Sequence, residues 1–360
     1  MSTKVLFCWS DISGYMAANW LALHTLPDID VFVLAFQAHT ETAFSDQLMA
    51  GIPSRLLNLE ERQNFPLIEK LVQKAQPDAV VFSGWLHPPY RKLAFSPTLK
   101  HCALVMGMDT PWWGTWRQHL APWLLHRYLQ RMDRVVVAGE RSWQYAQRLG
   151  IPVAKIQRGL YGIDDQVWHP LWQERQQSPW PQSFLFVGRY APSKGIDILV
   201  EAYRQYRSRI SDPWGLVCCG QGTLGDRLQN QAGIENRGFV QPTDMIAVWR
   251  QAGAFLLPSR FDPWPLALVE ASAAGLPVVC TDVCGSSVEV IRPGYNGIIV
   301  PQENPEALAR ALLSLHEHYE LLSTWGKRAQ QLAAPYAAQI WADRWHELLN
   351  EVVKKALAGA

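Results

Sequence analysis

The sequence predicts an α/β protein made of two doubly wound, Rossmann-like domains, and three observations support this prediction. The chain has 360 residues, more than one hydrophobic core normally supports. Its composition, 48% apolar and 18% charged, is typical of a globular protein. Short β-rich runs alternate with longer helix-compatible stretches in two separate series, and such alternation is typical of βαβ units with parallel sheets.

The first series predicts an N-terminal domain over residues 1–165. Each of its β-rich runs is short and apolar, and a longer stretch compatible with a helix follows it. The predicted strands are Val5–Trp9, Val31–Phe36, Ala79–Phe82, Cys102–Met106 and Arg134–Ala138.

The second series predicts another domain over residues 183–335. Its strands are Ser183–Gly188, Leu216–Cys219, Arg237–Val240, Ala254–Leu257, Pro277–Cys280 and Gly297–Val300. Residues 166–182 are interpreted as a linker, because this stretch is rich in Gln and Pro and has no periodicity. A last helix is expected within 336–360. Its apolar residues need a surface to cover, and they are Ile340, Trp341, Trp345, Leu348 and Leu349.

Charge and composition exclude several classes of protein. The 33 basic and 32 acidic residues give a net charge of +1, which argues against a nucleic-acid partner. The six cysteines have no paired metal-binding spacing, so we expect free thiols and no metal site. No apolar run approaches the roughly 20 residues of a membrane span, and the N-terminus has no secretory signature. A cytoplasmic protein is therefore expected.

Two carboxylates mark the stretch Pro258–Glu270. It follows the predicted strand 254–257, so Asp262 should lie in the loop at the strand's carboxyl end. Glu270 should lie just inside the next helix, with Pro265 at the first helical position. Ligands of doubly wound sheets bind at that edge, and free helix N–H groups suit a phosphate. The pattern suggests a polyhydroxylated, phosphorylated ligand such as a nucleotide sugar.

Two cations follow the first strand of the second domain. The strand ends at Gly188, and Arg189 and Lys194 then lead into a helix through Gly195. Arginine offers a planar fork of donors and lysine a point charge, and both pair well with phosphate oxygens. The alternative is two solvated surface cations, which the position at the carboxyl edge disfavours.

These motifs resemble the retaining glycosyltransferases of family four, the glycosyl transferases group 1, which have the GT-B fold. The resemblance rests on Gly188-Arg189, on Lys194-Gly195, and on Asp262 followed eight positions later by Glu270. It is strong over 159–317 and weak in the first domain. Supporting segments occur in the family's order: 161–164, 168–170, 217–222, 238–240, 253–259, 284–291 and 294–300.

The resemblance implies two Rossmann-like domains facing a central cleft, with the last helix crossing back to the first domain. The first domain would bind the acceptor and the second the nucleotide sugar, which is a substrate, so that no cofactor is expected. The enzyme would transfer a hexose with retention and without a metal in polysaccharide or glycolipid biosynthesis. A UDP-sugar resembling UDP-glucose is favoured as donor, and the acceptor is a glycan, a glycolipid or a small molecule.

The family's roles can be carried onto matching positions. Arg189 and Lys194 would hold the diphosphate, Glu270 the ribose hydroxyls, and Asp262 the donor sugar. Phe239 and Val240 would lie near the base, and the backbone N–H groups around Leu266 and Ala267 would meet the phosphate. Gly188 and Pro265 are further donor-binding positions. The family usually has Glu-Gly-Phe-Gly where this chain has Asp262-Pro263-Trp264-Pro265, which leaves the sugar open.

Three residues of the first domain are weaker candidates. Gly14 follows the first strand and could contact the donor, the alternative being a simple strand–helix turn. Asp109 is the only ionisable group where many family members have a histidine. It would bind the donor sugar or the acceptor, or else cap the element that begins near Pro111. His87 is a candidate acceptor ligand, the alternative being an ordinary loop histidine.

A stretch rich in Trp and Arg covers 112–134. Ordinary packing, stacking of a sugar acceptor on Trp112 and Trp113, and peripheral contact with the inner membrane face all remain open.

Two other functions are considered for the whole chain. A nucleotide-sugar epimerase on the same fold would act on the donor alone. A non-catalytic glycan-binding protein would not need the cations that suit a diphosphate. A dinucleotide oxidoreductase is disfavoured, because no strand precedes a GxGxxG turn.

Overall fold

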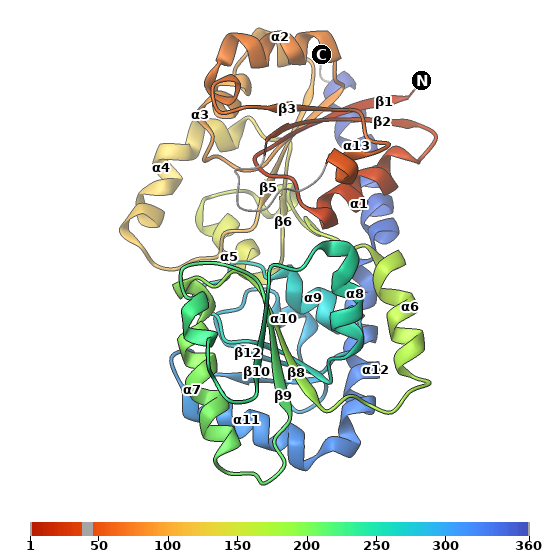
Figure 1. Ribbon diagram of the computed structural model, residues 1–360. Coiled ribbons are helices and arrows are strands. Elements are labelled where there is room, and N and C mark those ends of the chain that lie inside the picture. The colour runs from red at the N-terminus through yellow and green to blue at the C-terminus, as the bar shows by residue number, and fades with distance from the viewer. Residues whose placement is uncertain (1, 38–45, 359–360) are drawn as a thin grey trace. The chain divides into compact units, whose positions relative to one another are not determined.

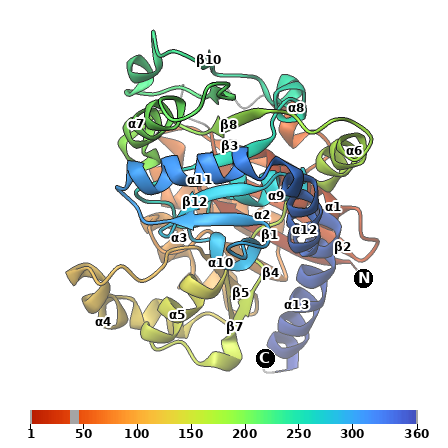
Figure 2. The same ribbon diagram turned by 90° about the horizontal axis from the view of Figure 1, so that it is seen from below.

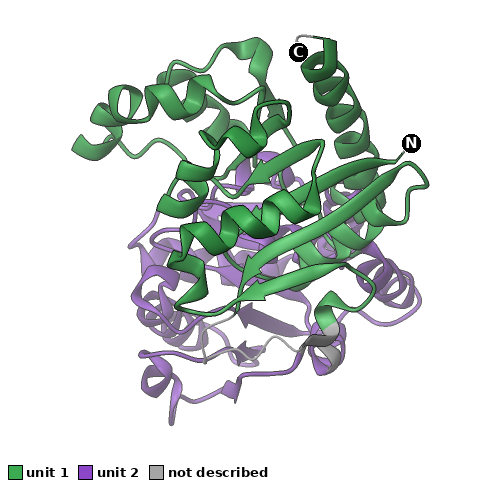
Figure 3. Ribbon diagram, turned by 90° about the horizontal axis from the view of Figure 1, so that it is seen from above, with its two compact units in different colours: residues 1–164, 336–360 green, residues 165–335 purple. Residues whose placement is uncertain are grey.

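The computed structural model describes residues 2–37 and 46–358 (Figure 1). The chain divides into two compact units (Figure 3). Unit 1 comprises Met1–Asp164 and Tyr336–Ala360, and unit 2 comprises Asp165–Pro335. Each unit contains one parallel sheet with helices, so the predicted α/β class with two Rossmann-like domains is confirmed.

Unit 1 contains a seven-stranded parallel sheet with the order β3-β2-β1-β4-β5-β6-β7. Its strands are β1 Thr3–Trp9, β2 Ile29–Phe36, β3 Ser54–Leu57, β4 Ala79–Phe82, β5 Ala103–Met108, β6 Arg134–Val137 and β7 Ile156–Arg158. In the central register, Val5 pairs with Val31 on one side and with Ala79 on the other. From β1 the chain adds strands on one side of the sheet up to β3, and from β4 it adds them on the other side. The neighbouring strands β1 and β4 are therefore the topological switch point of the unit.

The helices of unit 1 cover a core of strand residues that are almost completely buried, such as Leu6, Val80 and Met106. They are α1 Gly14–His24, α2 Phe65–Ala75, α3 Pro88–Leu93, α4 Trp116–Gln130, α5 Glu140–Arg148 and α13 Ala338–Ala358. The short 3-10 turns are η1 Asp46–Met49, η2 Glu61–Gln63, η3 Pro97–Leu99, η4 Val153–Lys155 and η8 Ala334–Tyr336, where η8 crosses the boundary between the units.

Helix α13 packs against α1 as part of unit 1. Trp341 and Trp345 are buried, and their indole N–H groups donate to the carbonyl oxygens of Leu160 at 2.8 Å and Gly159 at 3.1 Å. Each bond satisfies the one polar group of a buried tryptophan. Ile340, which the sequence grouped with the covering face, is 42% exposed.

Unit 2 contains a six-stranded parallel sheet with the order β10-β9-β8-β11-β12-β13. Its strands are β8 Ser183–Val187, β9 Gly215–Cys219, β10 Ile234–Gly238, β11 Ala254–Leu257, β12 Val278–Thr281 and β13 Gly297–Val300. The switch point of this unit lies between β8 and β11. The prediction for β10 was shifted, since the strand ends at Gly238 and leaves Phe239 and Val240 in the loop that follows.

Helices flank the sheet of unit 2 (Figure 2). They are α6 Asp165–Arg175, α7 Ile196–Arg207, α8 Pro242–Arg250, α9 Leu266–Ala273, α10 Ser287–Val290, α11 Pro305–Glu317 and α12 Leu322–Ala333. The 3-10 turns are η5 Pro192–Lys194, η6 Gly225–Leu228 and η7 Tyr319–Leu321.

The interpretation of 166–182 as an irregular linker was wrong, because α6 occupies most of it and packs within unit 2. Trp168, Leu171 and Trp172 are buried there. The guanidinium of Arg175, a side chain only 6% exposed, donates to three carbonyl oxygens at 2.6–3.0 Å. Burial lowers the pKa of Arg175 to about 10. These three hydrogen bonds hold the end of α6 against the rest of unit 2, and composition alone does not reveal this contact.

Replacement of Trp341 tests the anchoring of α13 in unit 1. Trp341→Ala removes a buried ring and its hydrogen bond, so we expect a loss of about 3–5 kcal/mol in the free energy of unfolding. Ile340→Ala, at the exposed neighbouring position, should cost less than about 1 kcal/mol. Urea unfolding measures both, and equal losses would contradict the packing described here.

Candidate functional site

The predicted residues of unit 2 gather at the carboxyl edge of its sheet, on both sides of the switch point. Strands β8 and β11 are parallel neighbours. Arg189 and Lys194 follow β8, while Asp262 and Glu270 follow β11. In open parallel sheets, the loops after the two strands at the switch point diverge and leave room for a ligand.

The loops after β8 and β11 are held together by a close backbone contact. Gly195 has a φ of +67°, and a Cβ there would lie 2.0 Å from the carbonyl oxygen of Pro258. The backbone N–H of Arg260 donates to the carbonyl oxygen of Ser193 at 2.8 Å. Glycine is required at position 195 both by the left-handed conformation and by the lack of space. This contact brings η5 against the loop that carries Asp262.

Lys194 and Asp262 form a largely buried ion pair. Their side chains are 18% and 8% exposed, and Lys194 Nζ donates to Asp262 Oδ2. Burial raises the pKa of Asp262, and the positive charges of Lys194 and Arg189 act in the opposite direction. The sequence assigned these two residues separate contacts, so their pairing is a finding of the structure. A lysine ammonium has three N–H donors, and further donors therefore remain for a ligand.

Arg189 is exposed beside this pair. Within the described ranges 2–37 and 46–358, its guanidinium makes no hydrogen bond or ion pair. Its charge nevertheless acts on Asp262, which places the guanidinium in the electrostatic field of the site. An exposed fork of N–H donors at this edge suits phosphate oxygens.

The N-terminus of α9 presents backbone donors at the same edge. Pro265 is the N-cap, with φ −67° and ψ 106°, so the helix begins at Leu266, one position later than expected. Its carbonyl oxygen accepts from the hydroxyl of Ser286 at 2.9 Å. No described residue accepts from the N–H groups of Leu266 and Ala267. Such free N–H groups and the helix dipole favour an anion.

Glu270 lies on α9, one turn further along. Burial raises the pKa of Glu270 from its ordinary value of 4.5 to about 7. Its carboxylate makes no hydrogen bond or ion pair among the residues that the structure describes. A carboxylate in such surroundings is stabilised by ligand hydroxyls that donate to it.

The other predicted residues of unit 2 lie along the same edge. Gly188 follows β8 directly, and its backbone N–H donates to the carbonyl oxygen of Cys219 at 3.0 Å. A Cβ at Gly220 would lie 1.9 Å from the carbonyl oxygen of Gly188, so these two loops also touch. Phe239, which is 40% exposed, and Val240 follow β10, two strands away from β8.

In unit 1, Asp109 follows β5 and accepts a hydrogen bond from the Tyr161 hydroxyl at 3.0 Å. The ring of Tyr15 packs edge-on against Tyr161, with centroids 5.7 Å apart. Burial and the charge of Asp109 raise the pKa of Tyr161. The alternative of a helix cap at Asp109 was wrong, because α4 begins at Trp116 and Thr115 caps it.

Gly14 and His87 lie near the switch point of unit 1. Gly14 is the first residue of α1, and the preceding Ser13 caps that helix. His87 precedes α3, and its ring lies 4.5 Å from the rings of Phe36 and Tyr90. Burial lowers the pKa of His87 to about 4, so the imidazole is neutral near pH 7.

Trp112 and Trp113 are held by neighbours within unit 1. The Trp112 ring packs against His119 at 4.8 Å and Tyr145 at 5.6 Å, and the guanidinium of Arg148 lies 4.8 Å from its centroid. The backbone N–H of Trp113 donates to Gln118. These contacts favour the packing interpretation for Trp112.

Arg260 is a positioning residue that the sequence analysis missed. Its guanidinium pairs with Asp197 and Glu303 and donates to the carbonyl oxygen of Pro192 at 3.0 Å. The hydrogen bonds that it donates to the two carboxylates raise its pKa further. It therefore ties η5 to the loop after β11. Because its partners lie 63 and 43 positions away, no local sequence signal reveals this role.

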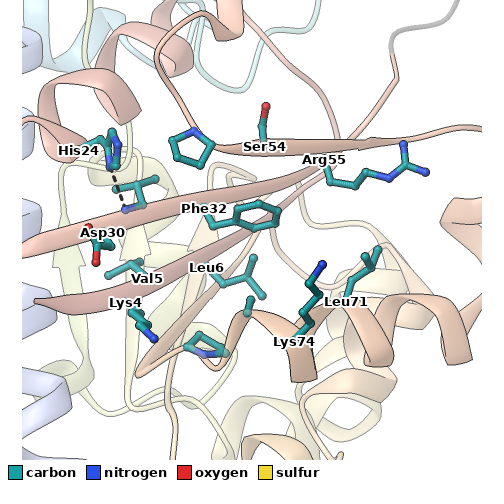
Figure 4. A pocket seen from close by; sticks show the side chains of 14 residues that line it. Lys4, Val5, Leu6, His24, Asp30, Phe32, Ser54, Arg55, Leu71 and Lys74 are labelled. Atoms are coloured by element: carbon teal, nitrogen blue, oxygen red, sulfur yellow. Dashed lines mark hydrogen bonds between the residues drawn. The ribbon is translucent and has the colours of Figure 1, made fainter.

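A separate pocket of about 530 Å³ lies in unit 1 (Figure 4). Side chains of β1, β2, β3 and α2 line it, including Lys4, Asp30 and Phe32. Lys4 and Asp30 are second residues of their strands, so the pocket lies toward the amino ends. Its lining includes none of the predicted site residues. Across the described residues, no cluster of three His, Cys, Asp or Glu side chains is placed to hold a metal ion.

Known proteins are similar to this chain over part or nearly all of its length. Residues 172–332 match the model of the family described as glycosyl transferases group 1. An exopolysaccharide phosphotransferase of Streptomyces coelicolor is 28% identical over 233 residues, 62% of this chain and 24% of that protein. The D-rhamnosyltransferase WbpZ of Pseudomonas aeruginosa is 26% identical over 220 residues, 58% of this chain and 56% of that protein. The chain thus matches less than two thirds of the length of either relative.

The structure of Anabaena HepE in complex with UDP is similar to this chain, with a TM-score of 0.74 and 18% identity. The similarity covers 97% of this chain and 100% of that chain. At this identity it shows the fold, and the predicted GT-B fold is confirmed. The residues that match the family model lie within unit 2.

The raised pKa of Glu270 predicts a specific dependence of stability on pH. A carboxyl group that ionises at about 7 when folded and near 4.5 when unfolded destabilises the folded state as pH rises through that interval. Glu270→Gln should therefore be more stable than the wild type at pH 8, by roughly 1–2 kcal/mol, and similar to it at pH 4.5.

Urea unfolding at both pH values measures this difference. Glu317→Gln, at an exposed position of α11, serves as the control and should follow the wild type. If Glu270→Gln has the same stability difference at pH 4.5 and pH 8, the carboxyl group is not held in a desolvated environment.

Proposed function

We propose that this chain transfers a sugar from a nucleoside diphosphate sugar to an acceptor, and that unit 2 binds the donor. The observation that carries this proposal is the grouping of cations, carboxylates and free N–H groups around the switch point of unit 2. Two strands, β8 and β11, flank that switch point. Arg189 and Lys194 follow β8, while Asp262, the start of α9 and Glu270 follow β11, and Lys194 pairs with Asp262.

A diphosphate fits the positive part of this site. The Arg189 fork, the remaining donors of Lys194, and the N–H groups of Leu266 and Ala267 can all bind phosphate oxygens. During transfer, the bond between the anomeric carbon and the phosphate oxygen breaks, and negative charge develops on the diphosphate. Donors already in place at that position stabilise the charge without further reorganisation.

The carboxylates suit the hydroxyl groups of the same molecule. Glu270 would accept hydrogen bonds from the ribose, and burial makes each such bond worth more than in water. Asp262 would accept from a hydroxyl of the transferred sugar, while Lys194 fixes the orientation of that carboxylate. Asp262 acts here through hydrogen bonds, as its buried pairing with lysine is unsuited to a freely titrating acid or base.

The proposed reaction retains the anomeric configuration and requires no metal. The acceptor oxygen forms a bond to the anomeric carbon on the face from which the diphosphate leaves. The acceptor's proton passes to the departing phosphate oxygen, and the nucleoside diphosphate is released. Unit 1 would bind the acceptor near the carboxyl edge of its sheet, where Asp109 and Tyr161 lie.

We propose a UDP-sugar resembling UDP-glucose as the donor, supported by the similarity of the chain to HepE, which was solved with UDP. The acceptor would be a glycan, a glycolipid or a small molecule. A thermal-shift series with UDP-glucose, GDP-mannose and ADP-glucose tests the donor, because a ligand of the native state raises the melting temperature. We expect the largest shift with the UDP-sugar, and no shift with any donor would contradict the proposal.

Product analysis separates transfer from epimerisation. Incubation of the chain with the donor alone should leave the sugar's configuration unchanged. An epimerised nucleotide sugar in the absence of acceptor would replace the transferase assignment by an epimerase.

Replacement of Arg189 tests the diphosphate contact without disturbing the buried pair. Arg189→Ala removes an exposed side chain, so the melting temperature should hardly change, while kcat/KM falls by about 100-fold. Arg227→Ala, at an exposed arginine elsewhere in unit 2, should keep full activity. Unchanged turnover in Arg189→Ala would remove the guanidinium from the proposed site.

A further inference from the structure

Helix α4 exposes a stripe of large apolar side chains. Trp116, Leu120, Trp123 and Leu124 are 68%, 39%, 78% and 78% exposed. Their spacing of i, i+4, i+7 and i+8 places them on one side of the helix. The opposite side carries the buried residues Gln118, Ala121, Leu125, Tyr128 and Leu129, which pack into unit 1. Helix α4 therefore has a second apolar side that covers nothing in unit 1.

Single exposed apolar residues are ordinary, but four on one side of one helix are not. The stripe spans about 12 Å along the helix, from the rise of 1.5 Å per residue. Leu86, in the loop after β4, is 87% exposed, and that loop is tied to α4 by a hydrogen bond from the Tyr128 hydroxyl to Gly84. Phe95, which is 48% exposed, lines the same groove as Leu124, so the exposed apolar surface extends beyond α4.

The charge of this region differs from that of the chain as a whole. Between residues 79 and 132 there is one acidic residue, Asp109, against six cations, although the whole chain has a net charge of only +1. Asp109 is engaged with Tyr161. The cations are Arg91, Lys92, Lys100, Arg117, Arg127 and Arg131. Arg127 and Arg131 share the exposed side of α4 with the apolar stripe.

A groove of about 540 Å³ lies between α3 and α4. Arg91, Lys92 and Arg127 line it together with Phe95 and Leu124, so cationic and apolar side chains are mixed within one concave surface. Figures 1 and 2 both place α4 at the margin of unit 1. We call the stripe, the groove and the flanking cations the α3–α4 surface.

We propose that the α3–α4 surface docks onto an anionic phospholipid bilayer. Tryptophan and leucine side chains insert at the boundary between head groups and acyl chains, where the indole ring is favoured. The arginines and lysines meet lipid phosphates, and the groove takes a head group. Among the helices of the described residues, none is long and apolar enough to cross a bilayer.

Charge complementarity separates this occupant from the alternatives. A second copy of the chain would bring two cationic surfaces together without acids to compensate them. An acidic protein would match the cations. It would not account for the exposed tryptophans, which suit the boundary between lipid head groups and acyl chains. An anionic bilayer matches both the charge and the apolar stripe at once.

Vesicle sedimentation with the full chain tests the proposal, in the absence of any nucleotide sugar. Binding is measured with two kinds of vesicle. One is phosphatidylcholine alone, and the other is phosphatidylcholine with about 30 mol% phosphatidylglycerol. We expect binding to the anionic vesicles only, weakened by salt. The double variant Trp123→Ser, Leu124→Ser should lower the partition coefficient at least about tenfold. Arg91→Gln and Arg127→Gln should each lower it about fivefold.

Matched controls change exposed residues of unit 1 outside this surface. The double variant Leu59→Ser, Val153→Ser removes two half-exposed apolar side chains and should bind vesicles like the wild type. Sedimentation velocity is run alongside. Absent binding to anionic vesicles, equal binding by the Trp123/Leu124 variant, or a dimer that this variant abolishes would each overturn the proposal. None of these outcomes depends on the proposed transfer reaction, which is assayed with a soluble acceptor.

Discussion

The close approach of two loops in unit 2 is the constraint on which the candidate site depends. Gly195 contacts the carbonyl oxygen of Pro258, and no side chain fits between them. This contact brings Lys194 onto Asp262, and Arg260 reinforces it by binding two carboxylates and the carbonyl oxygen of Pro192. The free energy that stabilises this arrangement is supplied by the fold, so the charged groups are in position before any ligand arrives.

The buried pair has a cost as well as a function. Two charges lose much of their hydration when they are buried, and their attraction offsets that loss only with good geometry. Removal of one partner leaves the other charge uncompensated, so variants of Lys194 or Asp262 affect folding as well as chemistry. Arg189 and Glu270, which have no partner among the described side chains, report on ligand binding more cleanly.

The sequence was sufficient for the elements whose residues are apolar and contiguous. Strands such as Ala79–Phe82 and Ala254–Leu257 were predicted with their observed bounds, because fully buried strands are short apolar runs. Strands β3 and β7 were missed because they are short and partly polar, and α6 was mistaken for a linker. Contacts between distant positions could not be predicted, such as Lys194 with Asp262, 68 residues apart, or Tyr161 with Asp109, 52 residues apart. The exposure of Trp123 was equally hidden, since the sequence does not reveal which side of α4 faces the core.

Amide hydrogen exchange with and without a UDP-sugar can locate the donor site, because it reports which backbone N–H groups the ligand engages. At saturating ligand we expect slower exchange at the start of α9, at Leu266 and Ala267, and in the loop from Gly188 to Gly195. Protection confined to unit 1, or none at all in these two segments, would contradict the assignment of the donor site to unit 2.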